Sequence, residues 1–185
     1  MTSTRTARLE LRSFRPDDGA AIFAYLAHPD AVRFEPYPMP SRDEADAIAI
    51  ARARDDRFVA VCRRDGLLIG NLYRAPEGPP AWNTWQIGYV FGPDHWGHGY
   101  ATEAVAQLIR DMFDERGAHR VVARCDTRNE RSWRLLERLG MRREAHVLQA
   151  ATFRNDDAGQ PVWHDAYHYA LVESDEAVAR RPGPA

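Results

Sequence analysis

The segment from residue 85 to residue 113 constrains this chain most, because a buried strand, a glycine-bearing loop and a strong helix follow one another without a break. The strand reads Trp85-Gln86-Ile87-Gly88-Tyr89-Val90-Phe91, and apolar residues at 3–4 spacing predict a helix over 101–113. Gly97 and Gly99 permit backbone angles that other residues resist, and they leave room for a ligand. The N–H groups of the loop and the positive end of the helix dipole can bind an anion. The pattern predicts a pyrophosphate-binding loop.

Two common phosphate-binding motifs do not fit this loop. A Walker loop needs Lys followed by Ser or Thr, whereas Gly99 is followed by Tyr100-Ala101. A Rossmann fingerprint needs a third Gly or Ala where Thr102 stands, and it follows the first strand of its unit, not the fourth. A glycine-rich turn that only starts a helix is the remaining alternative.

The rest of the pattern predicts an α/β (α+β) fold in one domain. Ser41–Glu44 and Thr127–Glu130 resemble capping boxes that open helices, and Asp65-Gly66 between apolar runs predicts a hairpin. We expect the order β α α β β β α β α β β, a mixed, mostly antiparallel sheet of about seven strands with helices on both faces. The expected strands are 9–12, 58–62, 67–73, 85–91, 120–125, 146–153 and 162–172, and the expected helices begin near residues 16, 41, 101 and 127. Residues 1–6 are expected to be a flexible start, 7–173 the domain and 174–185 a tail.

Composition excludes several classes of function. The 185 residues are 44% apolar and 28% charged, with a formal net charge of −2, so no basic surface for nucleic acid or anionic membrane is expected. Cys62 and Cys125 lack metal or redox spacing and stand in apolar runs, which predicts inert core thiols. No secretion signal and no apolar stretch of about 20 residues is present, so we expect a cytosolic protein by default.

Several separated motifs together resemble the GNAT superfamily of N-acetyltransferases, in particular the branch of the ribosomal-protein alanine acetyltransferases. The cofactor signature of that superfamily, Gln/Arg-x-x-Gly-x-Gly/Ala, is matched by Trp96-Gly97-His98-Gly99-Tyr100-Ala101, with Trp96 as the departure. Residues 8–12, 86–89 and 129–141 match further motifs of the branch in the right order, so the resemblance covers about residues 7–173. It implies an acyltransferase that uses acetyl-CoA as co-substrate, without a metal.

The resemblance also implies which residues bind the cofactor. The fourth strand is expected to splay from the fifth, so that backbone groups around Tyr89–Phe91 bind the pantetheine arm, and one amide there could stabilise the oxyanion. Asn129 and Ser132 lie one helical turn apart and are expected to face the pantetheine and the thiol, although either could simply cap its helix. The expected cofactor-binding residues are Tyr89, Val90, Phe91, Trp96, Gly97, His98, Gly99, Tyr100, Ala101, Thr102, Asn129 and Ser132.

The catalytic groups are harder to assign. Ser132 is a candidate for protonating the departing thiolate, with Tyr169, or Tyr167, as the alternative. Many relatives carry Glu where Gln86 stands, and Gln cannot take up a proton, so Glu35 in the Pro-rich loop 34–40 is the next candidate base. His95 and His98 lie in the loop without metal-ligand spacing.

The expected reaction is acetyl transfer to a primary amine by direct attack. A peptide or protein N-terminus and a small amine are both open as acceptors, and a homodimer is left open. A non-catalytic acyl-CoA-binding sensor is the alternative, and the missing Glu at position 86 is its only support.

Overall fold

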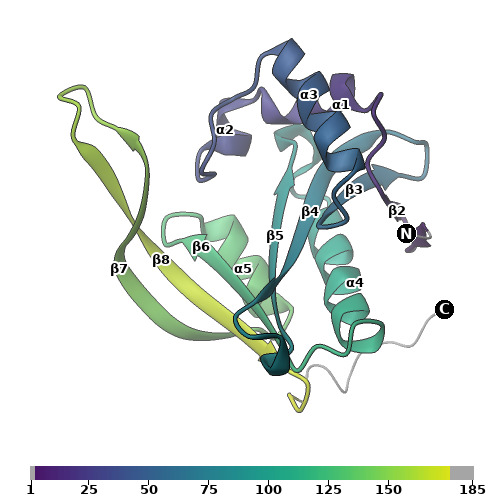
Figure 1. The fold of residues 1–185 in the computed structure, drawn as a ribbon, viewed down its shortest axis with the longest axis vertical. Coiled ribbons are helices and arrows are strands. Elements are labelled where there is room, and N and C mark those ends of the chain that lie inside the picture. The colour runs from purple at the N-terminus through teal and green to yellow at the C-terminus, as the bar shows by residue number, and fades with distance from the viewer. Residues whose placement is uncertain (1–2, 176–185) are drawn as a thin grey trace. The chain divides into compact units, whose positions relative to one another are not determined.

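The computed structural model describes residues 3–175, which form two compact units. The first unit contains residues up to 74 and residues 88–107, and the second contains residues 75–87 and those from 108 onward. The elements in chain order are β1 Thr4–Arg5, β2 Leu9–Arg12, α1 Gly19–Leu26, α2 Pro29–Val32, α3 Arg42–Ala53, β3 Phe58–Arg63, β4 Leu68–Glu77, β5 Thr84–Phe91, α4 Tyr100–Asp114, β6 Arg120–Asp126, α5 Glu130–Arg138, β7 Arg142–Asn155 and β8 Pro161–Val172, with short 3-10 helices η1 Pro80–Trp82 and η2 Pro93–His95 (Figure 1).

The strands form one mixed sheet in the order β1-β2-β3-β4-β5-β6-β8-β7. Its β1–β2, β2–β3 and β3–β4 pairs are antiparallel, as are β6–β8 and β7–β8, whereas β5 and β6 run parallel. A parallel pair requires a crossover connection, and α4 supplies it. The predicted fold class, a mixed and mostly antiparallel sheet with flanking helices, is confirmed, with one strand more than the expected seven.

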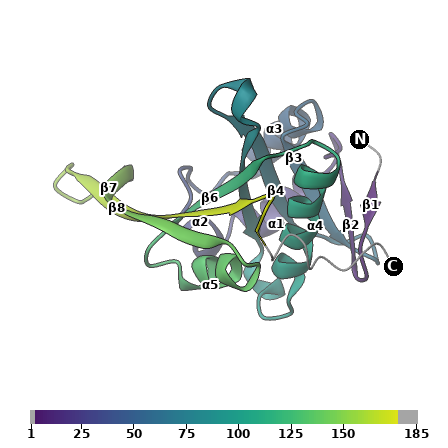
Figure 2. The same cartoon turned by 90° about the horizontal axis from the view of Figure 1, so that it is seen from below.

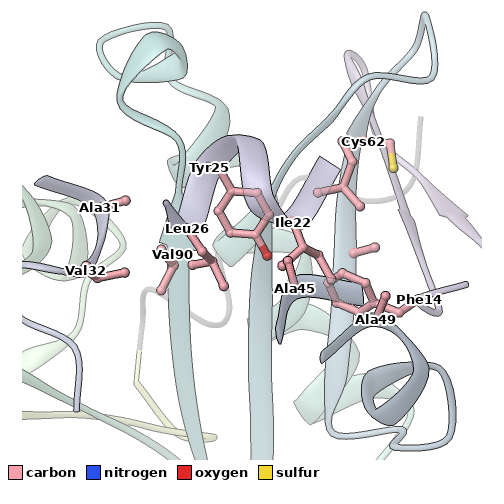
Figure 3. Packing of buried hydrophobic residues seen from close by; sticks show 12 residues of the cluster. Phe14, Ile22, Tyr25, Leu26, Ala31, Val32, Ala45, Ala49, Cys62 and Val90 are labelled. Atoms are coloured by element: carbon pink, nitrogen blue, oxygen red, sulfur yellow. The ribbon is translucent and has the colours of Figure 1, made fainter. Parts of the chain in front are cut away.

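In the first unit, helices α1 and α3 pack together over one face of the strands. Ile22 and Tyr25 of α1 meet the small residues Ala45 and Ala49 of α3, and the cluster continues to Phe14 (Figure 3). Alanines spaced four apart keep the surface of α3 flat, so α1 can approach closely. The predicted capping box of α3 is present: Ser41 Oγ accepts from the Glu44 N–H, and the Glu44 carboxylate accepts from the Ser41 N–H.

In the second unit, the β7–β8 hairpin is a long ribbon. Its pairing with β6 runs from Arg120↔Val172 to Asp126↔Ala166, and β8 then continues toward Pro161 paired with β7 alone (Figure 2). The ribbon carries a bulge between Val147 and Ala151, where Gln149 has a positive φ of 47° and donates its N–H to Asp165. Helix α5 contacts β6 and β7.

Several details differ from the sequence-based expectations. Strand β1 lies within the expected flexible start and pairs Thr4 with Leu11, and the one-turn helix α2, capped by His28, was not expected. Helix α1 begins at Gly19 rather than at Pro16. Strand β7 is also longer than expected, because it begins at Arg142. Most of the expected tail 174–185 lies outside the described residues.

Candidate functional site: the β5–α4 loop and the candidate acid and base groups

The loop between β5 and α4 adopts a conformation that depends on its glycines. Gly97 and Gly99 have φ angles of +80° and +78°, in the left-handed region that side-chain-bearing residues rarely adopt. Trp96 between η2 and the loop is extended, and its Nε1–H donates to the Phe91 carbonyl oxygen at 2.9 Å. The Trp96 hydrogen bond and the two glycine conformations therefore define the path of the backbone from the end of β5 to the start of α4 at Tyr100.

The N–H groups of residues 97–102 are available to a ligand. Over the described part of the chain, these N–H groups donate to no protein acceptor, and α4 takes its first hydrogen bond from the Glu103 N–H to the Gly99 carbonyl oxygen. A Cβ at Gly97 would meet nothing within 4 Å. Free N–H groups, open space and the positive end of a 15-residue helix suit a pyrophosphate, so the residues present fit the expected cofactor.

An ion pair that the sequence did not predict fixes this loop to the segment just before β2. The Arg8 guanidinium donates to Glu103 at 2.7 Å and to the His98 carbonyl oxygen at 2.8 Å, and it lies over the Tyr100 ring. Glu103 also accepts from Thr6 and from the Arg8 N–H. Burial raises the pKa of Glu103, but these hydrogen bonds outweigh burial and lower it. The 95-residue separation of the two partners leaves no local signal in the sequence.

The end of β5 carries the backbone groups expected to bind the pantetheine arm. The parallel ladder joins Thr84–Ile87 to Arg120–Ala123, and Tyr89, Val90 and Phe91 follow its last pair. Val90 and Phe91 are buried. Gln86 pairs with Val122 inside the ladder.

Glu35 lies half-buried in the loop after α2. Burial raises the pKa of its carboxyl to about 7, against the opposing effects of a hydrogen bond from Tyr37 and the positive charge of Arg52. The Glu35 N–H donates to the Val32 carbonyl oxygen at 3.0 Å, which ties the loop to α2. A carboxyl with this pKa can both accept and release a proton at neutral pH.

At the start of α5 the structure corrects the predicted cap. Asn129, not Thr127, is the N-cap residue, and its Oδ1 accepts from the Ser132 N–H at 3.2 Å. The turn before it is held by Asp126, whose buried carboxylate accepts from the Arg128 N–H and guanidinium and from His164 Nδ1 at 2.6 Å. The Asn129 side chain thus has the capping role that the sequence left open.

The candidate acids have different surroundings. Ser132 on α5 hydrogen-bonds Cys125, whose pKa burial raises to about 11. The Tyr169 hydroxyl donates to Glu137 and accepts from Arg143, and the ring is 1% exposed. Since its proton is already shared with Glu137, this arrangement weighs against Tyr169 as the acid. Tyr167 lies under the Arg143 guanidinium at 3.9 Å.

The two cysteines and the two loop histidines are the remaining candidate groups. Cys62 and Cys125 are buried free thiols, as predicted. His98 stacks on Tyr100, and burial is the largest cause that lowers the pKa of His95. The described residues contain no cluster of three potential metal ligands, and no helix among them is long and apolar enough to span a membrane.

Comparison with known proteins agrees with this geometry. Residues 8–142 match the family described as acetyltransferase (GNAT) domain. The chain is 29% identical over 173 residues to the uncharacterized N-acetyltransferase YnaD of Bacillus subtilis, covering 92% of this chain and 96% of YnaD. The crystal structure of a GNAT-family acetyltransferase from Bacillus anthracis superposes with a TM-score of 0.85 at 26% identity, over 94% of this chain and all of that one.

More distant structures share the fold alone. The ribosomal-protein-S5-alanine acetyltransferase of Vibrio fischeri has a TM-score of 0.78 at 18% identity, covering 95% of this chain and 98% of that chain. The spermidine N-acetyltransferase of Vibrio cholerae, solved with CoA and spermine, has a TM-score of 0.75 at 18% identity, covering 91% and 98%. The alanine acetyltransferase branch is therefore one of several structural neighbours. The family match covers well over half of the chain, so this protein belongs to the GNAT family and is an acetyltransferase.

Proposed function

We propose that this enzyme moves the acetyl group of acetyl-CoA directly to the uncharged form of a primary amine, on a peptide or protein N-terminus or on a small molecule. The observation that carries this proposal is the β5–α4 loop, where Gly97 and Gly99 hold the left-handed conformation and the N–H groups of residues 97–102 have no acceptor among the described residues. The residues assigned to the cofactor are Tyr89, Val90, Phe91, Trp96, Gly97, His98, Gly99, Tyr100, Ala101, Thr102, Asn129 and Ser132.

The proposed chemistry forms one bond and breaks one. The amine nitrogen attacks the thioester carbonyl carbon, the C–N bond forms, and the C–S bond then breaks. Glu35 takes the proton that the amine loses, which suits a carboxyl with a pKa of about 7. Ser132 donates a proton to the departing thiolate and recovers it from water. A backbone N–H near Val90 stabilises the oxyanion.

An acceptor of low pKa fits these groups best. Position 86 holds Gln, and a carboxyl with a pKa of about 7 is a weak base. The V. fischeri and V. cholerae neighbours are named for a protein alanine and for spermidine, so they support an amine but do not choose between these classes. The family match disfavours a non-catalytic sensor. A homodimer and a cytosolic location stay predictions.

Two linked measurements test this proposal. Calorimetry in the presence of a chelator should show binding of both acetyl-CoA and CoA, and a thiol assay should show CoA release that depends on added amine. Binding without amine-dependent release, across peptides and small amines, would favour the sensor. Absence of binding would refute the cofactor assignment.

A further inference from the structure

The second unit contains a cavity of about 290 Å³ on one face of its strands. All the residues that line it belong to this unit, and β4, η1, β5, β6, β7 and β8 each contribute to it. The register places Arg124, His168 and Ala145 in one row across β6, β8 and β7. Ser132 of α5 hydrogen-bonds Cys125, the residue after Arg124, so this row and the cavity lie on the face of the sheet opposite α5.

The charged side chains that line this cavity are already paired with one another. Arg124 donates two hydrogen bonds to Glu77, at 2.6 and 2.8 Å, although the two side chains are 39% and 33% exposed. Arg120 pairs with Glu144 in the same two-pronged way. The lining residues therefore offer no unpaired counter-charge to a charged ligand, which would lose its water without compensation.

Two uncharged side chains of the cavity are available to a ligand. Among residues 3–175, the ring of His168 has no hydrogen-bond partner. Burial, and then the charge of Arg124, lower the pKa of His168, so the ring is neutral at pH 7 and offers one donor and one acceptor. Trp82 is 62% exposed, and its ring lies against Gly78. A ring face of this kind can stack on another aromatic group.

The cavity also reaches the end of the parallel ladder. Ala123 is one of its lining residues, and the pair of Ala123 with Ile87 is the last of that ladder. The family resemblance leads us to expect the thioester of acetyl-CoA just past this pair. The volume of the cavity is near the lower end of the roughly 300–1,000 Å³ of small-molecule sites, which leaves room for one side chain or one small ring.

We propose that this cavity binds the part of the acceptor that lies next to its amine, and that it selects an uncharged aromatic group there. This inference rests on the proposed function, in which a primary amine attacks acetyl-CoA. Trp82 stacks on the aromatic ring of the acceptor, and His168 hydrogen-bonds its polar substituent. The two ion pairs disfavour charged groups, because neither partner of either pair is free. An α-amine beside a tyrosine side chain has all of these features.

The test compares kcat/KM for the α-acetylation of three amino acid amides, those of tyrosine, lysine and aspartic acid. Their α-amines are similar, so they differ mainly in the side chain. We expect tyrosine amide to exceed each charged amide by at least about tenfold. Arg124→Met leaves the Glu77 carboxylate unpaired and should raise kcat/KM for lysine amide at least about tenfold. Glu77→Gln leaves the Arg124 guanidinium unpaired and should do the same for aspartic acid amide.

Further variants supply a safeguard and a control. Trp82→Ala removes an exposed ring, so the fold should survive, and the KM for tyrosine amide should rise at least about threefold while that for lysine amide stays unchanged. Arg42→Met and Asp46→Asn break an exposed ion pair of α3 and should leave the order of the three amides as in the wild type. Circular dichroism checks the fold, and the Kd for CoA should change less than about twofold in every variant.

The possible failures of the inference and of the proposed function are distinguishable. A charged amide that exceeds tyrosine amide in the wild type, or an order that neither Arg124→Met nor Glu77→Gln changes, would overturn the inference alone, since CoA release would still depend on the amine. A wild type that releases no CoA with any amide or peptide would overturn the proposed function and the inference together.

Discussion

At the scale of single residues, anion binding by the β5–α4 loop depends on Gly97. Its φ is +80° and a Cβ there would meet no other atom within 4 Å, so Gly97→Glu adds a carboxylate to the loop without a collision. We expect CoA affinity to fall about 100-fold, or about 2.7 kcal/mol, in calorimetry, because like charges repel in a site built for phosphate.

A matched variant separates a local effect on the loop from the general effect of added charge and backbone strain. Gly159 in the β7–β8 turn has a φ of +77° and equally open space. Gly159→Glu therefore carries the same strain and charge and should bind CoA as the wild type does. Unchanged CoA affinity in Gly97→Glu would mean that the phosphates bind elsewhere, and equal losses in the two variants would mean that the effect is not specific to the loop.

Ser132 makes a second residue-scale prediction. If its hydroxyl protonates the thiolate, Ser132→Ala should lower kcat at least about tenfold, while the Kd for CoA changes by less than about twofold. Pre-steady-state kinetics and calorimetry measure the two effects. Equal losses in both would reduce Ser132 to a binding residue. A larger loss in Tyr169→Phe would transfer the acid role to Tyr169.

At the scale of elements, the close approach of β4 and β5 depends on Gly70. A Cβ at Gly70 would collide with the carbonyl oxygen of Val90 and come within 2.9 Å of the Phe91 ring. Gly70→Ala should therefore displace the end of β5, with a loss of about 1–3 kcal/mol in the free energy of unfolding and a lower kcat. Chemical denaturation and steady-state rates measure these changes.

Gly88 on the neighbouring strand β5 provides the control for Gly70. A Cβ there meets only Tyr73, at an ordinary 3.7 Å. Gly88→Ala should change the free energy of unfolding by less than about 0.5 kcal/mol. An equally mild effect of Gly70→Ala would show that the end of β5 does not depend on this close approach.

The turn before α5 predicts a pH-dependent contribution to stability. Burial raises the pKa of Asp126, but hydrogen bonds from Arg128 and His164 outweigh it, so the pKa lies below its usual value. The pKa of Asp126 is lower in the folded chain than in the unfolded chain. Its stabilising contribution is therefore fully present above the unfolded pKa of about 3.9 and is lost as the pH falls through the folded pKa. Asp126→Asn should lower the free energy of unfolding by about 2 kcal/mol at pH 7. The difference in this free energy between the variant and the wild type should become smaller toward pH 3.

Urea denaturation at several pH values measures this gap. Asp157→Asn, at an exposed position in the β7–β8 turn, is the control and should match the wild type throughout. A gap that stays constant from pH 7 to pH 3 would show that the Asp126 carboxylate contributes packing rather than charge.

These elements also show which parts of the molecule a sequence reveals. Helix α4, strand β5 and the Asp65-Gly66 hairpin have strong local periods or turn residues, so they are predictable from sequence. The N-cap of α5 is not, because Asp126 fixes that turn through His164, 38 residues away. The loop glycines can be recognised in the sequence, whereas the contacts of Arg8 with Glu103 and His98 join residues about 90 positions apart and no spacing encodes them.

At the scale of the whole molecule, the two units divide the proposed roles. The first contains the anion-binding loop and Glu35, and the second contains Asn129 and Ser132. The position of β8 between β6 and β7 in the sheet order could not be read from the sequence, since a hairpin can add either strand first. Family membership and fold together establish acetyl transfer, and the acceptor is the remaining chemical variable.

The class of acceptor can be inferred from the attacking species, which must be the neutral amine. At pH 7 about 14% of a peptide α-amine is neutral but only about 0.04% of a lysine side chain, from reference pKa values of about 7.8 and 10.4. This several-hundredfold gap, about 3.4 kcal/mol, requires a strong base in a lysine-directed enzyme. Gln86 is no base, and Glu35 is a weak one. We therefore expect a preference for α-amines.

Acetylation of a peptide panel at pH 7, followed by mass spectrometry that locates the acetyl group, tests this claim most directly. The panel contains free and blocked N-termini, each with and without lysine. We predict acetyl-CoA-dependent modification of the free N-termini and at least about 100-fold slower modification of lysine in the blocked peptides. Faster modification of lysine in the blocked peptides than of free N-termini would contradict the account.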